Sequence, residues 1–216
     1  MSIVPTFIEK FRQYRDAAYA ILFLQTFEET RVVADFAALQ KSGGFDEPIF
    51  QWSSVVGLQQ IGVETPVEKE TNAIKLLDRI TMLPVGSIIL LKDAPLPALS
   101  RHLRDMLPHL ESTNKTLVFI SPSVNIPLEL EKDVTIMEYP LPDQAALKTI
   151  LMGMIQEQEK ENSCTISAPK AGKVAEMAAG LTANEARNAF ALALGKYGKL
   201  NDEAVKTVLR EKAGAL

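Results

Sequence analysis

The stretch AYAILFLQ at residues 18–25 decides the fold. It is a short and nearly continuous apolar run, which is typical of a strand buried on both faces of a parallel sheet. Further strands are predicted at 47–52, 87–93, 115–121 and 134–139, and apolar residues at helical spacing predict helices over 2–15, 28–39, 66–83 and 99–110. Because strands and helices alternate, we expect an α/β core over residues 1–143 with a doubly wound, parallel, five-stranded sheet.

The last third of the chain carries no strand pattern. We expect helices over 144–162, over 168–196 with a break near Gly180, and over 201–212. Residue types that commonly cap a helix N-terminus stand near helix starts in this region: Asp143, Thr182, and either Asn201 or Asp202. The sequence therefore predicts a second domain over residues 144–216, a small all-helical lid.

Composition places the chain among folded globular proteins. Its 216 residues are 47% hydrophobic and 23% charged, which excludes a disordered tail, a fibre or a coiled coil as the whole structure. The single cysteine, Cys164, cannot form an internal disulfide, which favours a reducing, cytoplasmic setting. The first twenty residues have no secretory pattern, and the longest apolar stretch, at 17–24, is far shorter than the ~20 residues of a membrane span. We expect no membrane contact.

Charge is unevenly distributed along the chain. The formal net charge is −4, yet residues 164–216 hold 8 basic side chains against 5 acidic ones, while residues 1–163 hold 15 against 22. The basic residues considered as a nucleic-acid patch are Lys170, Lys173, Arg187, Lys196, Lys199, Lys206 and Arg210. A solvated helical face is the commoner explanation of such a segment, and we favour it.

The loop after the first strand lacks the features of a phosphate site. In such folds the first strand leads into a helix whose N-terminal amides hold anions. Instead of GxxxxGK[ST], residues 26–31 read TFEETR, without glycine or lysine. Glu28 and Glu29 suit the helix dipole themselves and would repel a triphosphate. We favour a role for them in stabilising the helix over a role in binding.

Other chemistry-bearing residues are sparse. Asp93 stands where a magnesium carboxylate would lie, but Lys92 precedes it, and an ion pair of Lys92 with a carboxylate is the simpler expectation. His102 and His109 have no third ligand at convincing spacing. We therefore expect no metal site, no cofactor and no catalytic residue.

Residues 180–194 fit two arrangements. They are compatible with the second helix of a helix-turn-helix, with Asn184, Arg187 and Asn188 exposed. They also fit a helix of a bundle in which Ala186, Phe190, Ala191 and Leu194 point inward. We favour the bundle.

Several motifs occur in an order that resembles one family. They are YAILFLQTFEETR (19–31), FQW (50–52), IILLKD (88–93), VFISPS (118–123), IPLELE (126–131), PLPD (140–143) and GLT (180–182) followed by Glu185-Ala186. In this order and spacing they resemble the N-terminal half of the plastid and cyanobacterial AAA-family ATPases that a conserved chloroplast reading frame encodes. The resemblance covers residues 5–212.

The resemblance implies a AAA+ domain that has lost its P-loop. Residues 25–31, with Glu28, Glu29 and Arg31, then mark a vestigial Walker A position, and Lys92-Asp93 a vestigial Walker B position. Ser121 falls at the sensor-one position, and Arg187 is placed loosely like a sensor-two arginine. No arginine stands between Ser121 and Leu141, where an arginine finger usually lies.

These features together predict a catalytically degenerate module that regulates or contacts other proteins. Its expected partners are an AAA-family ATPase or further copies of itself. Two alternatives stay open: a nucleic-acid-binding accessory subunit similar to the inactive clamp-loader subunits, and a noncanonical ATPase. We expect no ATPase activity from this chain.

Overall fold

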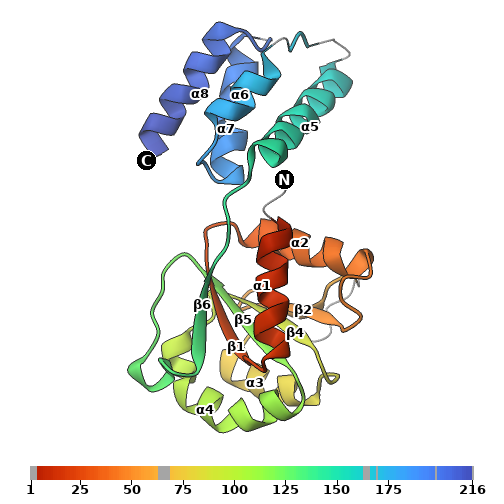
Figure 1. Cartoon of the computed structure of the whole chain (residues 1–216), viewed down its shortest axis with the longest axis vertical. Helices are drawn as coiled ribbons and strands as arrows, with labels where there is room; N and C mark the ends of the chain where they lie inside the picture. The colour runs from red at the N-terminus through yellow and green to blue at the C-terminus, as the bar shows by residue number, and fades with distance from the viewer. Residues whose placement is uncertain (1–3, 63–68, 163–165, 169, 198, 216) are drawn as a thin grey trace. The chain divides into compact units, whose positions relative to one another are not determined.

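The computed structural model describes residues 4–62, 69–162, 166–168, 170–197 and 199–215 (Figure 1). The chain divides into two compact units, of which one is Ile8–Tyr139 and the other includes Pro140–Leu216. The first unit is α/β and the second is helical. The assignment of domains to residues 1–143 and 144–216 stays a prediction.

A six-stranded sheet forms the centre of the first unit, in the order β3-β2-β4-β5-β1-β6. Its strands are β1 (Ile21–Gln25), β2 (Ile49–Ser53), β3 (Gly57–Gln60), β4 (Ile88–Lys92), β5 (Thr116–Ser121) and β6 (Val134–Glu138). All neighbouring pairs are parallel except β2 and β3, which are antiparallel. The predicted α/β class with a doubly wound, mostly parallel sheet is confirmed.

The predicted number of five strands is wrong by one. Strand β3 follows β2 in a hairpin and lies at the edge of the sheet. Its four residues are Gly57, Leu58 and two glutamines, and only Leu58 contributes a buried apolar side chain. This segment is too short and too polar to contain the apolar run by which the other strands were predicted. Its strand conformation depends instead on its pairing with β2.

Two helices cover one face of the sheet. Helices α3 (Ala73–Met82) and α4 (Leu96–Ser112) bury leucines and isoleucines against alternate residues of the strands, such as Phe23 and Phe119. The residues between these, such as Leu22, are also fully buried and face the other side. Asn72 caps α3, because its side chain accepts hydrogen bonds from two backbone amides. This helix therefore starts later than predicted. Residues 66–68, with which the predicted helix began, lie outside the described residues.

Three phenylalanines join the remaining helices of this unit. Phe11 of α1 (Val4–Asp16) makes edge-to-face contacts with Phe36 of α2 (Glu29–Lys41) and with Phe45, at centroid distances of 5.0 and 5.8 Å. Phe36 and Phe45 stack at 6.3 Å. All three rings are buried, so this cluster holds α1 and α2 together.

Arg15 ties the end of α1 to two loops. Its buried guanidinium donates Nη2 hydrogen bonds to the Gly86 carbonyl oxygen at 2.5 Å and to Glu47 Oε1 at 3.0 Å. Partial burial acts to raise the pKa of Glu47, but the hydrogen bond and charge of Arg15 outweigh it and hold that pKa below its ordinary value. The ionised form of Glu47 is therefore the one that the fold favours.

We expect a pH-dependent effect of Glu47→Gln on stability. The pKa of Glu47 is lower in the folded state than in the unfolded state. Its charge therefore stabilises the fold fully above about pH 4.3, and this stabilisation is lost as the pH falls through the folded-state pKa. The urea midpoint of the variant should lie below that of the wild type at pH 7, and the difference should narrow as the pH falls below about 4.3. Glu9→Gln, the same change on an exposed part of α1, is the control. A midpoint difference that is constant from pH 7 to pH 3 would contradict the assignment.

Within the described residues, four helices form the second unit, as its sequence predicts. They are α5 (Gln144–Asn162), α6 (Ala171–Met177), α7 (Ala183–Tyr197) and α8 (Asp202–Ala215). The predicted caps are present: Asp143 accepts from the Ala146 amide at 2.8 Å, and Asn201 accepts from the amides of Glu203 and Ala204 at 3.1 Å. Thr182 and Glu185 form a reciprocal capping box.

Helix α7 belongs to the core of a bundle. Ala186, Phe190 and Leu194 are buried in the apolar centre of the unit, as the bundle arrangement predicts, whereas Ala191 is exposed. Arg187 is also exposed. The structure therefore explains this stretch by packing.

Candidate functional site

The predicted site residues of the first unit lie at or shortly after the carboxyl ends of three parallel strands, β1, β4 and β5. Gln25 at the end of β1 is in register with Ser121 at the end of β5, and Lys92 at the end of β4 is in register with Ile120. Backbone hydrogen bonds continue past the strands: the Thr26 amide donates to the Ser121 carbonyl at 3.2 Å, and the Asp93 amide donates to that of Ile120 at 3.0 Å. The loops after β1, β4 and β5 are thus held side by side.

A small cavity lies between these loops. It encloses about 150 Å³, and its lining consists of Thr26, Phe27, Glu29, Asp93, Ile120, Ser121 and Pro122. Glu29, Asp93 and Ser121, which the sequence singled out, are therefore brought together. Sequence reasoning did not single out Phe27, which also lines the cavity. This residue is 77% exposed. An aromatic residue in the loop between a strand and a helix is a signal that could have identified it.

Glu28 lies apart from this cavity and points into the protein. Its residue is only 4% exposed, and its Oε2 forms an ion pair of 2.7 Å with Nη2 of Arg31, one turn further along α2. The Glu28 amide donates to Thr26 Oγ1 at 3.0 Å, which turns the chain into the helix. The prediction that Glu28 only stabilises the helix dipole is therefore incomplete, because this carboxylate also balances a largely buried arginine.

Arg31 connects Glu28 to the last residue of the first unit. Its guanidinium carbon lies 4.4 Å from the ring centroid of Tyr139, within cation–π distance. The Tyr139 hydroxyl donates a hydrogen bond to Asp35 Oδ2, one turn beyond Arg31 on α2. Burial, and then the Asp35 hydrogen bond, raise the pKa of Tyr139 above its ordinary value, so its hydroxyl stays protonated. We name Glu28, Arg31, Asp35 and Tyr139 the α2 network.

Lys92 is not among the described residues that line this cavity. It lines a separate hollow of about 30 Å³ with residues of β2 and β3, including Trp52, because successive side chains of a strand leave opposite faces. Among the described residues, no carboxylate lies within ion-pair distance of Lys92. The predicted ion pair of Lys92 is therefore wrong for the described part of the chain.

Arg187 belongs to the second unit, where it is exposed on α7. Two members of the basic patch on that unit are engaged: Lys170 pairs with Asp202 at 3.3 Å, and Lys206 pairs with Glu203 at 2.7 Å. The side chain of Lys196 lies outside the described residues. Nucleic-acid binding by this patch stays a prediction, and these pairs reduce the charge on which it depends.

The electrostatics of the cavity suit cations better than anions. Two carboxylates line it, and α2 begins with Glu28 and Glu29, so negative charge already occupies the helix N-terminus where a phosphate would be held. Within the described residues, no three His, Cys, Asp or Glu side chains lie close enough together to hold a metal ion. In that same part of the chain, no helix is long and apolar enough to cross a membrane.

The class of the protein follows from this architecture. A parallel sheet with its candidate site at the carboxyl edge, followed by a small helical unit, is an AAA+-like ATPase fold. The chain belongs to the SpoVK-like AAA ATPase family: the model of that family's N-terminal domain matches residues 7–139, and the model of its second domain matches residues 145–216.

Two curated relatives extend this result. Both are described as uncharacterized AAA domain-containing protein ycf46. The one from Guillardia theta is 27% identical, with 97% of this chain and 42% of the relative aligned. The one from Trieres chinensis is 22% identical, with 91% of this chain and 39% of the relative aligned. The chain thus spans about two fifths of their length, and the predicted resemblance to the plastid-type family is confirmed.

Solved structures agree on the fold. Caenorhabditis elegans PCH-2 has a TM-score of 0.52 and 12% identity, over 97% of this chain and 67% of that structure. A point mutant of Thermotoga maritima RuvB has a TM-score of 0.51 and 13% identity, over 97% and 70%. At these identities the likeness concerns the fold alone.

Proposed function

We propose that this chain is a catalytically degenerate AAA+ module that acts through its surfaces, on an AAA-family ATPase or on further copies of itself, and does not turn over ATP. The observation that carries the proposal is the α2 network. At the helix start where this fold class holds phosphate, the chain has a buried glutamate paired with its own arginine. The positions Glu28, Glu29, Arg31, Lys92, Asp93, Ser121 and Arg187 are then remnants of a nucleotide site.

The cavity supports the same conclusion. A triphosphate needs open amides and a cation, whereas this cavity presents Glu29 and Asp93. Its volume of about 150 Å³ is also below the ~300–1,000 Å³ of usual small-molecule sites. Lys92, the nearest candidate cation in sequence, lines a different hollow.

We expect no measurable binding of Mg-ATP to the chain. Without P-loop amides and lysine, the β and γ phosphates lose the contacts that localise their charge. Isothermal titration calorimetry with millimolar Mg-ATP should show no saturable heat. The double variant Glu29→Gln/Asp93→Asn, which removes both cavity carboxylates, should behave in the same way, because relief of repulsion does not restore the missing contacts.

Two results would contradict this proposal. Micromolar ATP affinity would show a working site, and steady turnover that Asp93→Asn abolishes would favour the noncanonical ATPase. The interaction role is tested separately, by sedimentation velocity of the purified chain with and without a purified SpoVK-like AAA ATPase and by the ATPase rate of the mixture. A chain that stays monomeric and leaves that rate unchanged would refute it.

A further inference from the structure

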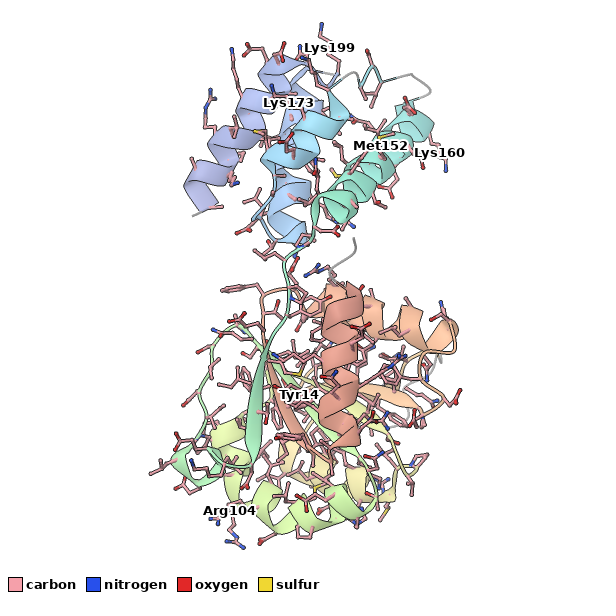
Figure 2. All side chains as sticks on the ribbon, viewed as in Figure 1. Tyr14, Arg104, Met152, Lys160, Lys173 and Lys199 are labelled. Atoms are coloured by element: carbon pink, nitrogen blue, oxygen red, sulfur yellow. The ribbon has the colours of Figure 1, made fainter. Side chains whose placement is uncertain are left out.

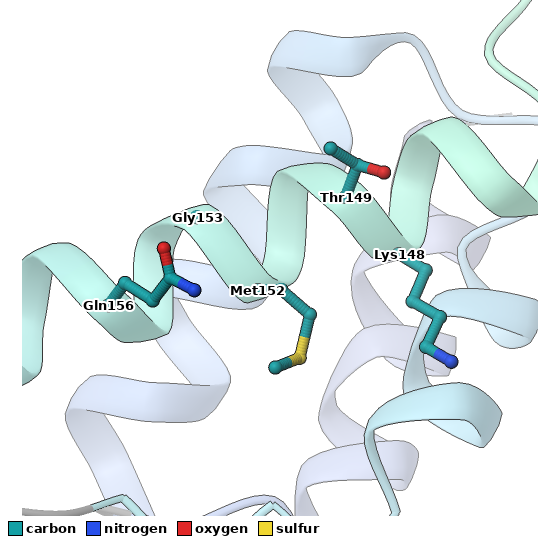
Figure 3. Close-up of a pocket in the computed structure, with 5 residues that line it drawn as sticks. All are labelled: Lys148, Thr149, Met152, Gly153 and Gln156. Atoms are coloured by element: carbon teal, nitrogen blue, oxygen red, sulfur yellow. The ribbon is translucent and has the colours of Figure 1, made fainter.

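A shallow hollow runs along the exposed face of α5 (Figure 3). Its volume is about 340 Å³, and the residues of the described part of the chain that line it come from this one helix: Lys148, Thr149, Met152, Gly153 and Gln156. The opposite face of α5 carries Leu147, Leu151 and Ile155, which are buried in the core of the second unit. The helix is therefore anchored on one side and presents a shaped surface on the other.

Gly153 is one of the residues that line the hollow. A Cβ atom added there would meet none of the described residues within 4 Å, so their packing does not require a glycine at this position. A glycine inside a helix costs about 1 kcal/mol relative to alanine, which calls for a compensating use. Met152 stands beside it, 37% exposed, on the same face (Figures 2 and 3).

The hollow has the spacing of a socket for a side chain from another helix. Thr149, Met152, Gly153 and Gln156 are related as i, i+3, i+4 and i+7, the four positions that surround a knob in helix packing. The centre of the socket falls between Met152 and Gly153. Met152 is exposed and lies at the same height along the helix axis as this socket. In a second α5 that runs antiparallel to the first, Met152 would lie at that same height and could enter the socket.

Charges on one edge of the face complete the match. Lys148 and Glu159 are eleven residues apart, about three turns, and so share one edge of the helix. When two antiparallel α5 helices are related by a two-fold axis, this edge of one helix meets the same edge of the other. Lys148 of one copy then lies near Glu159 of the second copy, and by symmetry this ion pair forms twice. In a two-fold parallel pair this edge would instead meet the opposite edge of the copy, away from Glu159. Glu159 also accepts a hydrogen bond from the Ile166 amide at 2.6 Å through Oε1, which holds its carboxylate in place.

We propose that the exposed face of α5 is a docking site for a second copy of this chain, with the two α5 helices antiparallel about a two-fold axis between Met152 and Gly153. The proposal deepens the proposed function by naming one partner, and it rests on that function. One helix stripe offers less than the ~800 Å² per partner of a standard interface. The dimer is therefore transient.

Disulfide cross-linking tests this geometry in the full chain with Cys164→Ser as background. Met152→Cys lies within one residue of the two-fold axis, so it should form covalent dimers under mild oxidation. Thr149→Cys and Gln156→Cys should each fail alone, since each lies about 10 Å along the axis from its own copy, beyond the ~7 Å limit of a disulfide. Mixed together, these two variants should cross-link, because Thr149 and Gln156 lie at the same level.

Arg104→Cys, on the exposed surface of α4, is the matched control for random collision (Figure 2). A Met152→Cys dimer that forms no faster than the Arg104→Cys dimer would overturn the proposal. Equal self-cross-linking by all three α5 variants would also overturn it, because that pattern belongs to a parallel pair. Neither outcome bears on ATP titration, so failure of this interface is distinguishable from failure of the proposed function.

The charge pattern gives an independent measurement. Lys148→Glu places like charges together at both ends of the interface and should weaken dimerisation about tenfold in sedimentation equilibrium. Adding Glu159→Lys should restore it. Thermal unfolding of both variants checks that the second unit is intact, and intact variants with unchanged dimerisation would contradict the antiparallel pair.

Discussion

Replacing Glu28 by alanine is expected to lower the free energy of unfolding of the first unit by about 3 kcal/mol. The change leaves the charge of Arg31, a largely buried side chain, without the carboxylate 2.7 Å away. Fluorescence of Trp52, the only tryptophan and a buried residue of β2, reports unfolding of this unit during a urea titration. Because 3 kcal/mol is a large fraction of the stability of a typical domain, the midpoint should fall clearly.

The neighbouring glutamate provides the control. Glu29 lies in the same helix turn but lines the cavity, so Glu29→Ala should cost well under 1 kcal/mol. The double variant Glu28→Ala/Arg31→Ala should be destabilised by less than the sum of the two single variants, since each single change breaks the same pair. Equal effects of the two glutamate variants would show that the α2 network does not hold this helix start.

Phe36→Ala should have the largest effect of any substitution considered, a loss of about 4 kcal/mol. Its ring is fully buried and contacts both Phe11 and Phe45, so truncation leaves a cavity that helices α1 and α2 cannot close. For a chain of this length the loss corresponds to a fall in melting temperature of roughly 10 °C. The same Trp52 signal follows the transition.

Phe27→Ala removes an identical side chain nine residues away. Since the Phe27 ring is 77% exposed, its loss should change the free energy of unfolding by less than about 0.5 kcal/mol. Comparable destabilisation by the two variants would mean that Phe36 is not part of a packed core.

The apolar strands were predictable because their composition alone requires burial. β1, β4 and β5 each carry four or more buried residues in succession, and no surface element tolerates such a run. β3 was not predictable, since it holds only one buried apolar side chain and owes its conformation to β2. Helices of the second unit were predicted closely, because capping residues such as Asp143 mark where they start.

The candidate site was predictable only in part. The order of strands brings Glu29, Asp93 and Ser121 to one edge, which the α/β pattern anticipates. The inward turn of Glu28 was not anticipated, because its partner Arg31 contacts Tyr139, more than one hundred residues later in the chain. Periodicity reports which residues are apolar, and it contains no information about which distant side chains pair.

Strand β3 also has a consequence for behaviour in concentrated solution. The edge of a sheet presents unpaired amide and carbonyl groups that can recruit strands from other molecules. Without β3 that edge would be β2, whose Ile49, Phe50 and Trp52 are buried. A four-residue strand with two half-exposed glutamines offers a much poorer template. We therefore expect this hairpin to protect its edge of the sheet from aggregation, and its removal to shorten the time for which the protein stays in solution.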